Sequence, residues 1–130
     1  MKSSYVLHPD KGYLASTFEG TVTLVELGLH IQQVWADPAW NPTFNGILDF
    51  SRATIDLSDD DLRSLTKSML ADSRCSLARF AFVVSNADDF RIFRKVDALT
   101  EELSTMRIFF NRAEAERWLL QPIAPKKKPD

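Results

Sequence analysis

The stretch Phe80-Ala81-Phe82-Val83-Val84 is the clearest strand signal in the sequence. An unbroken apolar run of this kind, rich in aromatic and β-branched side chains, is typical of a strand that is covered on both faces. Such strands lie inside parallel sheets, whose crossover connections usually contain a helix. The stretch therefore predicts an α/β domain with a largely parallel sheet and helices packed against it.

Helices are predicted immediately before and after this strand. On the amino-terminal side, Ser58 precedes the acidic run 59–61 and a series of leucines at helical spacing, as expected of a capped helix with acids in its first turn. On the carboxyl-terminal side, Asn86 is followed three residues later by Asp89, and apolar residues then recur with the helical period. Both segments have the amphipathic pattern of helices that cover a sheet.

The alternation of strands and helices continues to both ends of the chain. Four more strands are predicted, at residues 5–8, 13–18, 46–50 and 106–110, and the first two flank a Pro-Asp-x-Gly turn. Two more helices are predicted, one starting at the capping box Thr23-x-x-Glu26 and one after Asn111. The predicted fold is an N-terminal β-hairpin followed by alternating helices and strands, with a mostly parallel sheet of four to five strands and about four helices.

Composition predicts one domain that folds on its own. The chain has 130 residues, of which 45% are hydrophobic and 26% are charged, and this is enough apolar surface for one core. We expect that domain to span residues 1–122 and a flexible basic tail to span 123–130. The net charge of −2 predicts no nucleic-acid-binding face. No run of about 18 uncharged apolar residues is found, so we expect a cytoplasmic protein without an integral membrane segment.

The titratable residues match no catalytic or metal-binding motif. Cys75 has no histidine near it in the sequence, and His8 and His30 are both expected to lie at the surface. The acidic residues at 56 and 59–61 lack the spacing of a calcium loop. No glycine-rich nucleotide-binding motif follows any strand. The sequence therefore predicts a protein that is not an enzyme and that holds no cofactor and no metal.

Several segments at the strands and strand-to-helix junctions resemble, in their order and spacing, those of a known domain family. They lie at residues 18–23, 47–51, 56–58, 80–84, 89–91, 108–110 and 113–119. In this order and spacing they resemble the junctions of the STAS domain, and local sequence narrows the resemblance to SpoIIAA-like proteins, which border on SEC14-type lipid-binding proteins. The resemblance covers most of the chain and implies a single STAS-like domain.

The resemblance also implies a regulatory role. In STAS regulators of sigma-factor pathways a partner kinase phosphorylates a serine that follows a central strand, and Ser58 occupies the most similar position. The chain departs from that pattern because the aspartates at 59–61 place three negative charges beside any incoming phosphate. Ser58 thus has two interpretations, a plain helix cap and a phosphorylation site.

Two functions remain open at this point. The first is a protein-interaction or regulatory module that binds a protein partner or a second copy of itself through a surface around Asp56, Ser58 and Phe90. The second is a carrier of an apolar small molecule or lipid, held between helices and sheet near Trp40, Phe90 and Phe93. The ends of the parallel strands are expected to form the mouth of that pocket.

Overall fold

The computed structural model describes residues 1–71, 78–99 and 106–121, and Cys75 and the predicted tail at 123–130 lie outside them. Five strands and four helices alternate as the sequence predicts. The strands are β1 (Lys2–His8), β2 (Tyr13–Val22), β3 (Asn45–Ile55), β4 (Phe80–Val83) and β5 (Met106–Phe109). The helices are α1 (Leu24–Trp35), α2 (Asp59–Ala71), α3 (Ala87–Leu99) and α4 (Arg112–Leu120).

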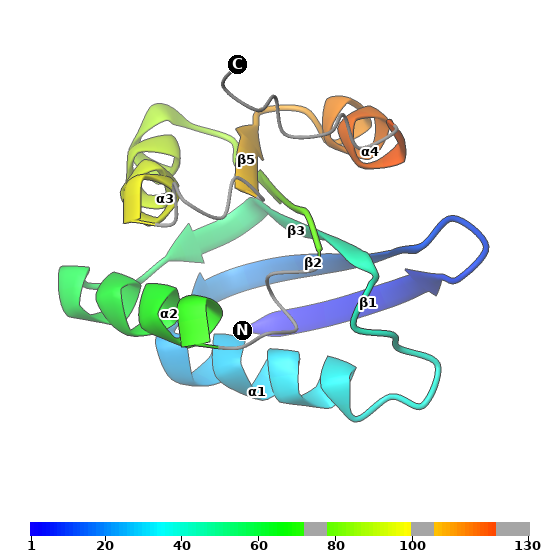
Figure 1. Ribbon diagram of the computed structural model, residues 1–130. Coiled ribbons are helices and arrows are strands. Elements are labelled where there is room, and N and C mark those ends of the chain that lie inside the picture. The colour runs from blue at the N-terminus through cyan, green and yellow to red at the C-terminus, as the bar shows by residue number, and fades with distance from the viewer. Residues whose placement is uncertain (72–77, 100–105, 122–130) are drawn as a thin grey trace, which may run out of the picture.

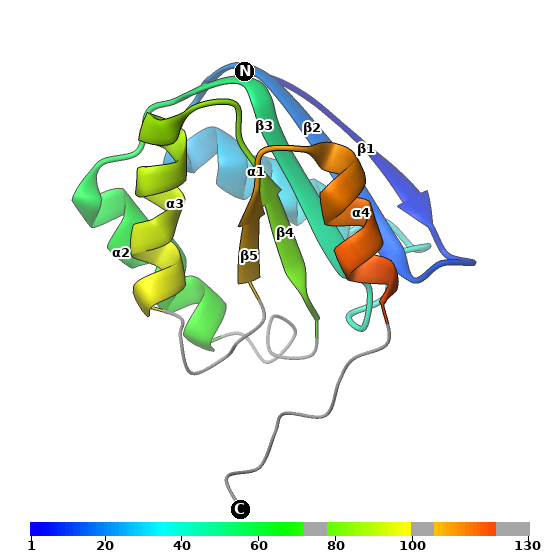
Figure 2. The same cartoon turned by 90° about the horizontal axis from the view of Figure 1, so that it is seen from above.

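The strands form one mixed sheet in the order β1-β2-β3-β4-β5. The β1–β2 hairpin is antiparallel, and each later strand pairs in parallel with the one before it. Because every crossover steps in the same direction, the right-handed rule places α1, α2 and α3 on one face of the sheet. The last helix, α4, lies on the other face (Figures 1 and 2).

An aromatic cluster forms the main core, between the sheet and α1–α3. The Phe50 ring stacks on Phe18 with 4.6 Å between ring centroids and lies 5.0 Å from Phe93. Phe82 meets Phe93 edge-on at 4.8 Å. All four rings are at most 3% exposed. Offset and edge-on aromatic pairs of this kind add to the free energy gained from burial alone.

A smaller core lies under α4. Ala115 and Leu119 of this helix pack on side chains from β2, β3 and β4, among them Tyr13 and Ile47. Arg79 fixes the end of the helix, because its guanidinium donates hydrogen bonds to the carbonyls of Leu119 (2.8 Å) and Gln121 (2.7 Å). These carbonyls belong to the last turn, where helices lack internal donors.

The strands β2 and β3 extend four to five residues beyond the predicted runs at 13–18 and 46–50. Their ladder continues through a register shift opposite Thr17 and Glu19, where β3 has one extra residue. Asp49 provides a hydrogen-bond acceptor at this bulge: its Oδ1 accepts from the Ser51 amide (2.9 Å) and from the Ser51 hydroxyl (2.6 Å). Polar residues alternate with apolar ones beyond the bulge, so the sequence there shows no continuous apolar run.

Ser58 caps α2 as one of its two interpretations predicts. Its Oγ accepts a hydrogen bond from the Asp61 amide at 3.0 Å, and the Asp61 carboxylate accepts one from the Ser58 amide at 3.0 Å. This reciprocal pair is a capping box with aspartate as its second member. The first helix has only half of such a box, since Thr23 accepts from the Glu26 amide while the Glu26 carboxylate pairs with the amino group of Met1.

The cap predicts that two substitutions at Ser58 differ in their effect on stability. Ser58→Ala removes the acceptor for the Asp61 amide and is expected to lower the free energy of unfolding by about 0.5–2 kcal/mol. Ser58→Asp keeps an acceptor and is expected to be nearly neutral. Urea unfolding of both variants checks this, and equal midpoints for Ser58→Ala and the wild type would contradict the cap.

Candidate functional site

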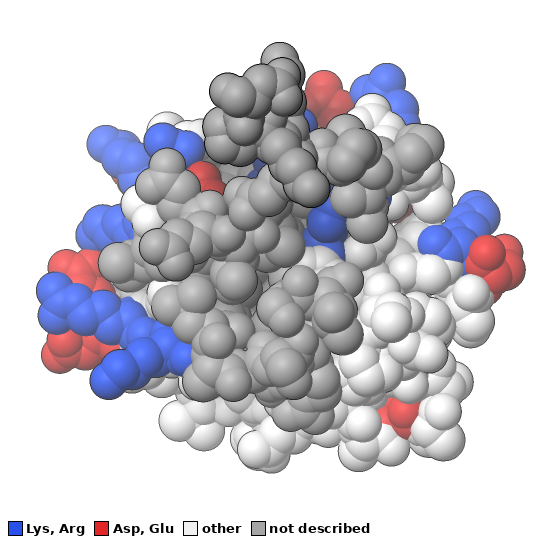
Figure 3. All heavy atoms as spheres, in the orientation of Figure 1, with Lys and Arg blue, Asp and Glu red and all other residues white. Residues whose placement is uncertain are grey.

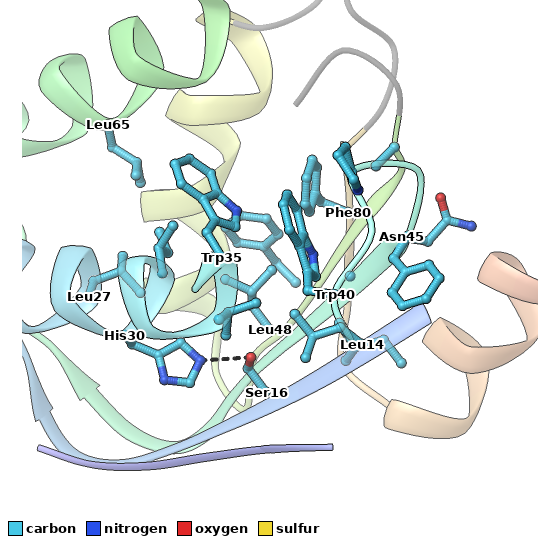
Figure 4. Close-up of a pocket in the computed structure, with 18 residues that line it drawn as sticks. Leu14, Ser16, Leu27, His30, Trp35, Trp40, Asn45, Leu48, Leu65 and Phe80 are labelled. Carbon is cyan, nitrogen blue, oxygen red and sulfur yellow. Dashed lines mark hydrogen bonds between the residues drawn. The ribbon is translucent and has the colours of Figure 1, made fainter. Parts of the chain in front are cut away.

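A cavity of about 100 Å³ lies between α1 and the amino ends of the parallel strands. The sheet supplies its floor, α1 and α2 supply one wall, and the loop between α1 and β3 covers it (Figure 4). The described residues that line it are almost entirely apolar, and no Asp, Glu, Lys or Arg is among them. They are Leu14, Ser16, Leu27, His30, Ile31, Val34, Trp35, Trp40, Pro42, Phe44, Asn45, Gly46, Ile47, Leu48, Leu65, Ala78, Phe80 and Phe82.

Two tryptophans stand over the cavity. Trp35 ends α1, and Trp40 comes from the loop that follows; their ring centroids are 6.0 Å apart and the rings are tilted by 33°. In Figure 4 both rings lie above Leu48 on the sheet, with Phe80 behind them. Both tryptophans are only partly buried. The cavity is thus bounded by aromatic faces on its solvent side.

Hydrogen bonds hold the covering loop in shape. Asp37 accepts from the Ala39 amide at 2.9 Å and from the Tyr5 hydroxyl at 2.8 Å, which ties the loop to β1. These two donors keep the pKa of the Asp37 carboxyl below its ordinary value, the Ala39 amide having the larger effect. Further along, Asn41 accepts from the Thr43 amide at 2.9 Å. Asx turns of this kind, together with Pro38 and Pro42, restrict the conformation of the loop that carries Trp40.

A glycine shapes the floor. A Cβ atom on Gly46 would lie 3.1 Å from Cδ1 of Phe80, so the absence of a side chain allows that ring to rest directly on β3. Gly46 and Phe80 are register partners at the amino ends of β3 and β4. The close approach leaves the space above Leu48 open.

The polar group at the base of the cavity is a buried histidine–serine pair. His30 of α1 is 4% exposed and Ser16 of β2 is 2% exposed. His30 Nε2 lies 2.8 Å from Ser16 Oγ, while its buried Nδ1 has no partner among the described residues. The rings of Phe18 and Tyr5 meet the imidazole edge-on. The expectation that His30 lies at the surface is therefore wrong.

Burial lowers the pKa of His30 below its ordinary value. A charged imidazole has two N–H donors, and one of them would lack an acceptor in this environment. The neutral ring is therefore the form that fits the folded protein. The base of the cavity is polar and uncharged at neutral pH.

This burial predicts a loss of stability in weak acid. The unfolded chain takes up a proton on His30 near pH 6.5, whereas the folded chain does so only at lower pH. Between these values the unfolded state binds more protons, so the free energy of unfolding falls as the pH falls, by at most about 1.4 kcal/mol per pH unit. Urea unfolding from pH 7.5 to pH 5 measures the slope. The slope is expected to shrink in His30→Gln, and an unchanged slope would contradict the assignment.

The structure separates the aromatic residues that were expected to share one pocket. Trp40 lines the cavity, but Phe93 is fully buried in the aromatic core and is not part of its lining. Phe90 lies in the first turn of α3 and stacks on Phe110 with 5.3 Å between centroids. The helix therefore turns Phe93 inward and Phe90 toward the end of the sheet. A shared site of Trp40, Phe90 and Phe93 is wrong.

Asp56, Ser58 and Phe90 lie at the other end of the sheet. Asp56 and Ser58 follow β3 and are exposed, and Phe90 follows β4, so these residues lie toward the carboxyl ends of the strands. The cavity is at the amino ends, where Asn45 and Phe80 begin β3 and β4. The strand ends that border the cavity are thus the amino ends.

Sequence reasoning also missed His30 and Ser16 as parts of one site. A signal for His30 was present, because Leu27, His30, Ile31 and Val34 follow the spacing of a buried helix face. On a strand, Ser16 points to the opposite face of the sheet from its neighbours Ala15 and Thr17, so the face on which it lies was predictable. Their pairing depends on how α1 crosses β2, and sequence spacing does not specify that.

Among the residues that the structure describes, no helix combines the length and the apolar character needed to cross a bilayer. Nor do three or more His, Cys, Asp or Glu side chains of those residues gather as ligands for a metal ion. A scan against protein-family models found no match, and a search of curated proteins found no similar protein.

Proposed function

We propose that this protein is a non-enzymatic, cytoplasmic module of the STAS-like kind that binds a small, neutral, apolar molecule in the cavity under Trp40. The observation that carries the proposal is a cavity whose described lining residues are uncharged and mostly apolar. The order of strands and helices supports the STAS-like resemblance. Apolar pockets with few polar groups are the usual form of small-molecule sites.

The size of the cavity selects small ligands. An engineered protein cavity of about 150 Å³ accommodates benzene, so about 100 Å³ of free space suits one aromatic ring or a short alkyl group. A complete lipid acyl chain exceeds that space and would have to extend past Trp40 into solvent. The favoured ligand is therefore compact, or is the compact apolar end of a larger molecule.

The chemistry of the lining selects a neutral group. None of the described residues that line the cavity has a charged side chain, and the environment of His30 disfavours its cation. An ion in this space would lose hydration without gaining a counter-charge, which costs several kcal/mol. The Ser16 hydroxyl provides one hydrogen-bonding position at the base. A ring or short chain with at most one hydroxyl or carbonyl group satisfies these conditions.

Tryptophan fluorescence tests the proposal with toluene as the probe. The chain has three tryptophans, and Trp118 is located on α4, away from the cavity. In a Trp118→Phe variant, the emission therefore reports on Trp35 and Trp40 alone. Burial of the aromatic ring favours binding and the loss of translational and rotational freedom opposes it, so we expect weak, saturable binding with a Kd on the order of 1 mM. Emission that stays unchanged up to the solubility limit of toluene would overturn the proposal.

A protein-interaction role is the second candidate, and the Phe90–Phe110 stack favours it. Phe110 is 58% exposed at the end of β5, beside the first turn of α3. Exposed aromatic side chains are enriched at protein interfaces. If this edge binds a partner, Phe110→Asp is expected to lose that partner in a pull-down while its unfolding midpoint stays near that of the wild type. A partner retained equally by both proteins would remove this candidate.

A further inference from the structure

We propose that the free edge of β1 is a self-association surface, which joins two copies of this chain through antiparallel pairing of β1 with β1. Among the described residues, β1 has a neighbouring strand on one side only. Its other side therefore has a row of backbone amides and carbonyls without a strand partner. Such an edge is a template for pairing with another strand.

The edge lacks the features that usually block pairing. It runs for seven residues, Lys2–His8, in unbroken register with β2, without a proline or a bulge. Its single charged side chain, Lys2, is at its first position. Val6, in the second half of the strand, is 57% exposed. Natural proteins protect edges with charges, prolines, bulges or short strands, and β1 has almost none of this protection.

The strand is complementary to itself. A two-fold axis at Tyr5 would place Ser4 opposite Val6 of the second copy, and Ser3 opposite Leu7. Even-numbered residues then lie opposite even-numbered ones, and odd opposite odd. Side chains on one face of the sheet therefore stay on that face across the junction. Lys2 would lie opposite His8, and no two carboxylates or ammonium groups would meet. The pairing thus joins two five-stranded sheets into one.

The neighbouring helix also suits an uncharged partner. α1 lies against β1, as the Tyr5–His30 contact shows, and its only charged side chain is Glu26. Its outer face includes Val25 and Leu29, which are 72% and 61% exposed. In Figure 3 the lower side of the molecule, over α1, shows few charged side chains, whereas the side over α2 and α3 carries both signs. Pairing through β1 would bring the two copies of α1 alongside each other on the same face of the sheet. A second copy presents the same two surfaces, and in the register described above no like charges oppose each other.

A charge-swap experiment tests the proposed register. Because Ser4 and Val6 would face each other across the junction, Ser4→Lys/Val6→Lys places two pairs of like charges in the interface. The double variant Ser4→Lys/Val6→Glu places opposite charges at the same positions. Both positions are exposed in the single chain, so each variant should keep the fold. Like charges directly opposite one another weaken strand pairing, and we expect the dissociation constant of the dimer to rise at least about tenfold in the first variant only.

Sedimentation equilibrium across a range of concentrations measures the outcome. We expect the wild type and the mixed-charge variant to reach twice the 14.8 kDa mass of one chain, and the double-lysine variant to stay near one chain mass. Circular dichroism melts establish that all three proteins are folded. A wild type that remains monomeric throughout overturns the proposal. So does a dimer that the two double variants form equally well, because its interface would lie elsewhere.

Discussion

Phe50→Ala is expected to lower the free energy of unfolding by about 3–5 kcal/mol, the range measured when a buried phenylalanine is removed. Phe50 is 0% exposed and its ring contacts those of Phe18, Phe82 and Phe93. Its removal leaves a cavity that these three rings share, and strands β2, β3 and β4 and helix α3 all border it. This loss is a large fraction of the stability of an ordinary domain.

Phe110→Ala is the matched control, since it removes the same side chain from a position that is 58% exposed. We expect it to cost less than about 1 kcal/mol. Urea unfolding followed by far-ultraviolet circular dichroism gives both values. Similar losses in the two variants would show that the aromatic cluster is not the centre of the core.

Leu48→Trp is expected to weaken the binding of small apolar molecules strongly. Leu48 lies at the floor of the cavity below Trp35 and Trp40, and an indole in its place would occupy most of the free space (Figure 4). We expect the affinity for toluene to fall at least about tenfold, since the ring can no longer be buried. Overpacking of the site should cost at most about 1–3 kcal/mol of stability.

The control for this variant is Leu120→Trp, which makes the same change at a position on α4 that is 51% exposed. It should bind toluene as the wild type does. Ligand-observed NMR serves as the assay, because the introduced indoles would complicate a fluorescence measurement. Binding that survives in Leu48→Trp, or that is lost equally in Leu120→Trp, would contradict the assignment of the cavity.

The sequence was sufficient to predict the fold class. The apolar run at 80–84 correctly indicated a strand covered on both faces, because β4 lies between β3 and β5 and three of its four residues are buried. Capping residues Ser58 and Asn111 correctly marked the starts of α2 and α4, because capping is a local interaction between a side chain and the next turn. The far ends of β2 and β3 were missed because their outward side chains are polar.

The site was much less predictable. Trp40 was identified as a ligand-site residue because a tryptophan in a loop did not fit any core pattern. Its neighbours in the cavity come from segments far apart in the chain, such as Leu14, Leu65 and Phe80, and a single sequence does not specify those contacts. Phe93 was misassigned because a small rotation of α3 about its axis exchanges a flanking residue for a buried one.

The most direct test of the binding cavity is a methyl NMR titration with toluene. Spectra of the isoleucine, leucine and valine methyl groups report contact with the ring at each position separately. We predict saturable shifts for the methyl groups of Leu14, Val34 and Leu48, which line the cavity, and none for the exposed Val25 and Leu120. Shifts confined to Val25 or Leu120, or a spectrum that does not change, would contradict a binding site between α1 and the amino ends of the strands.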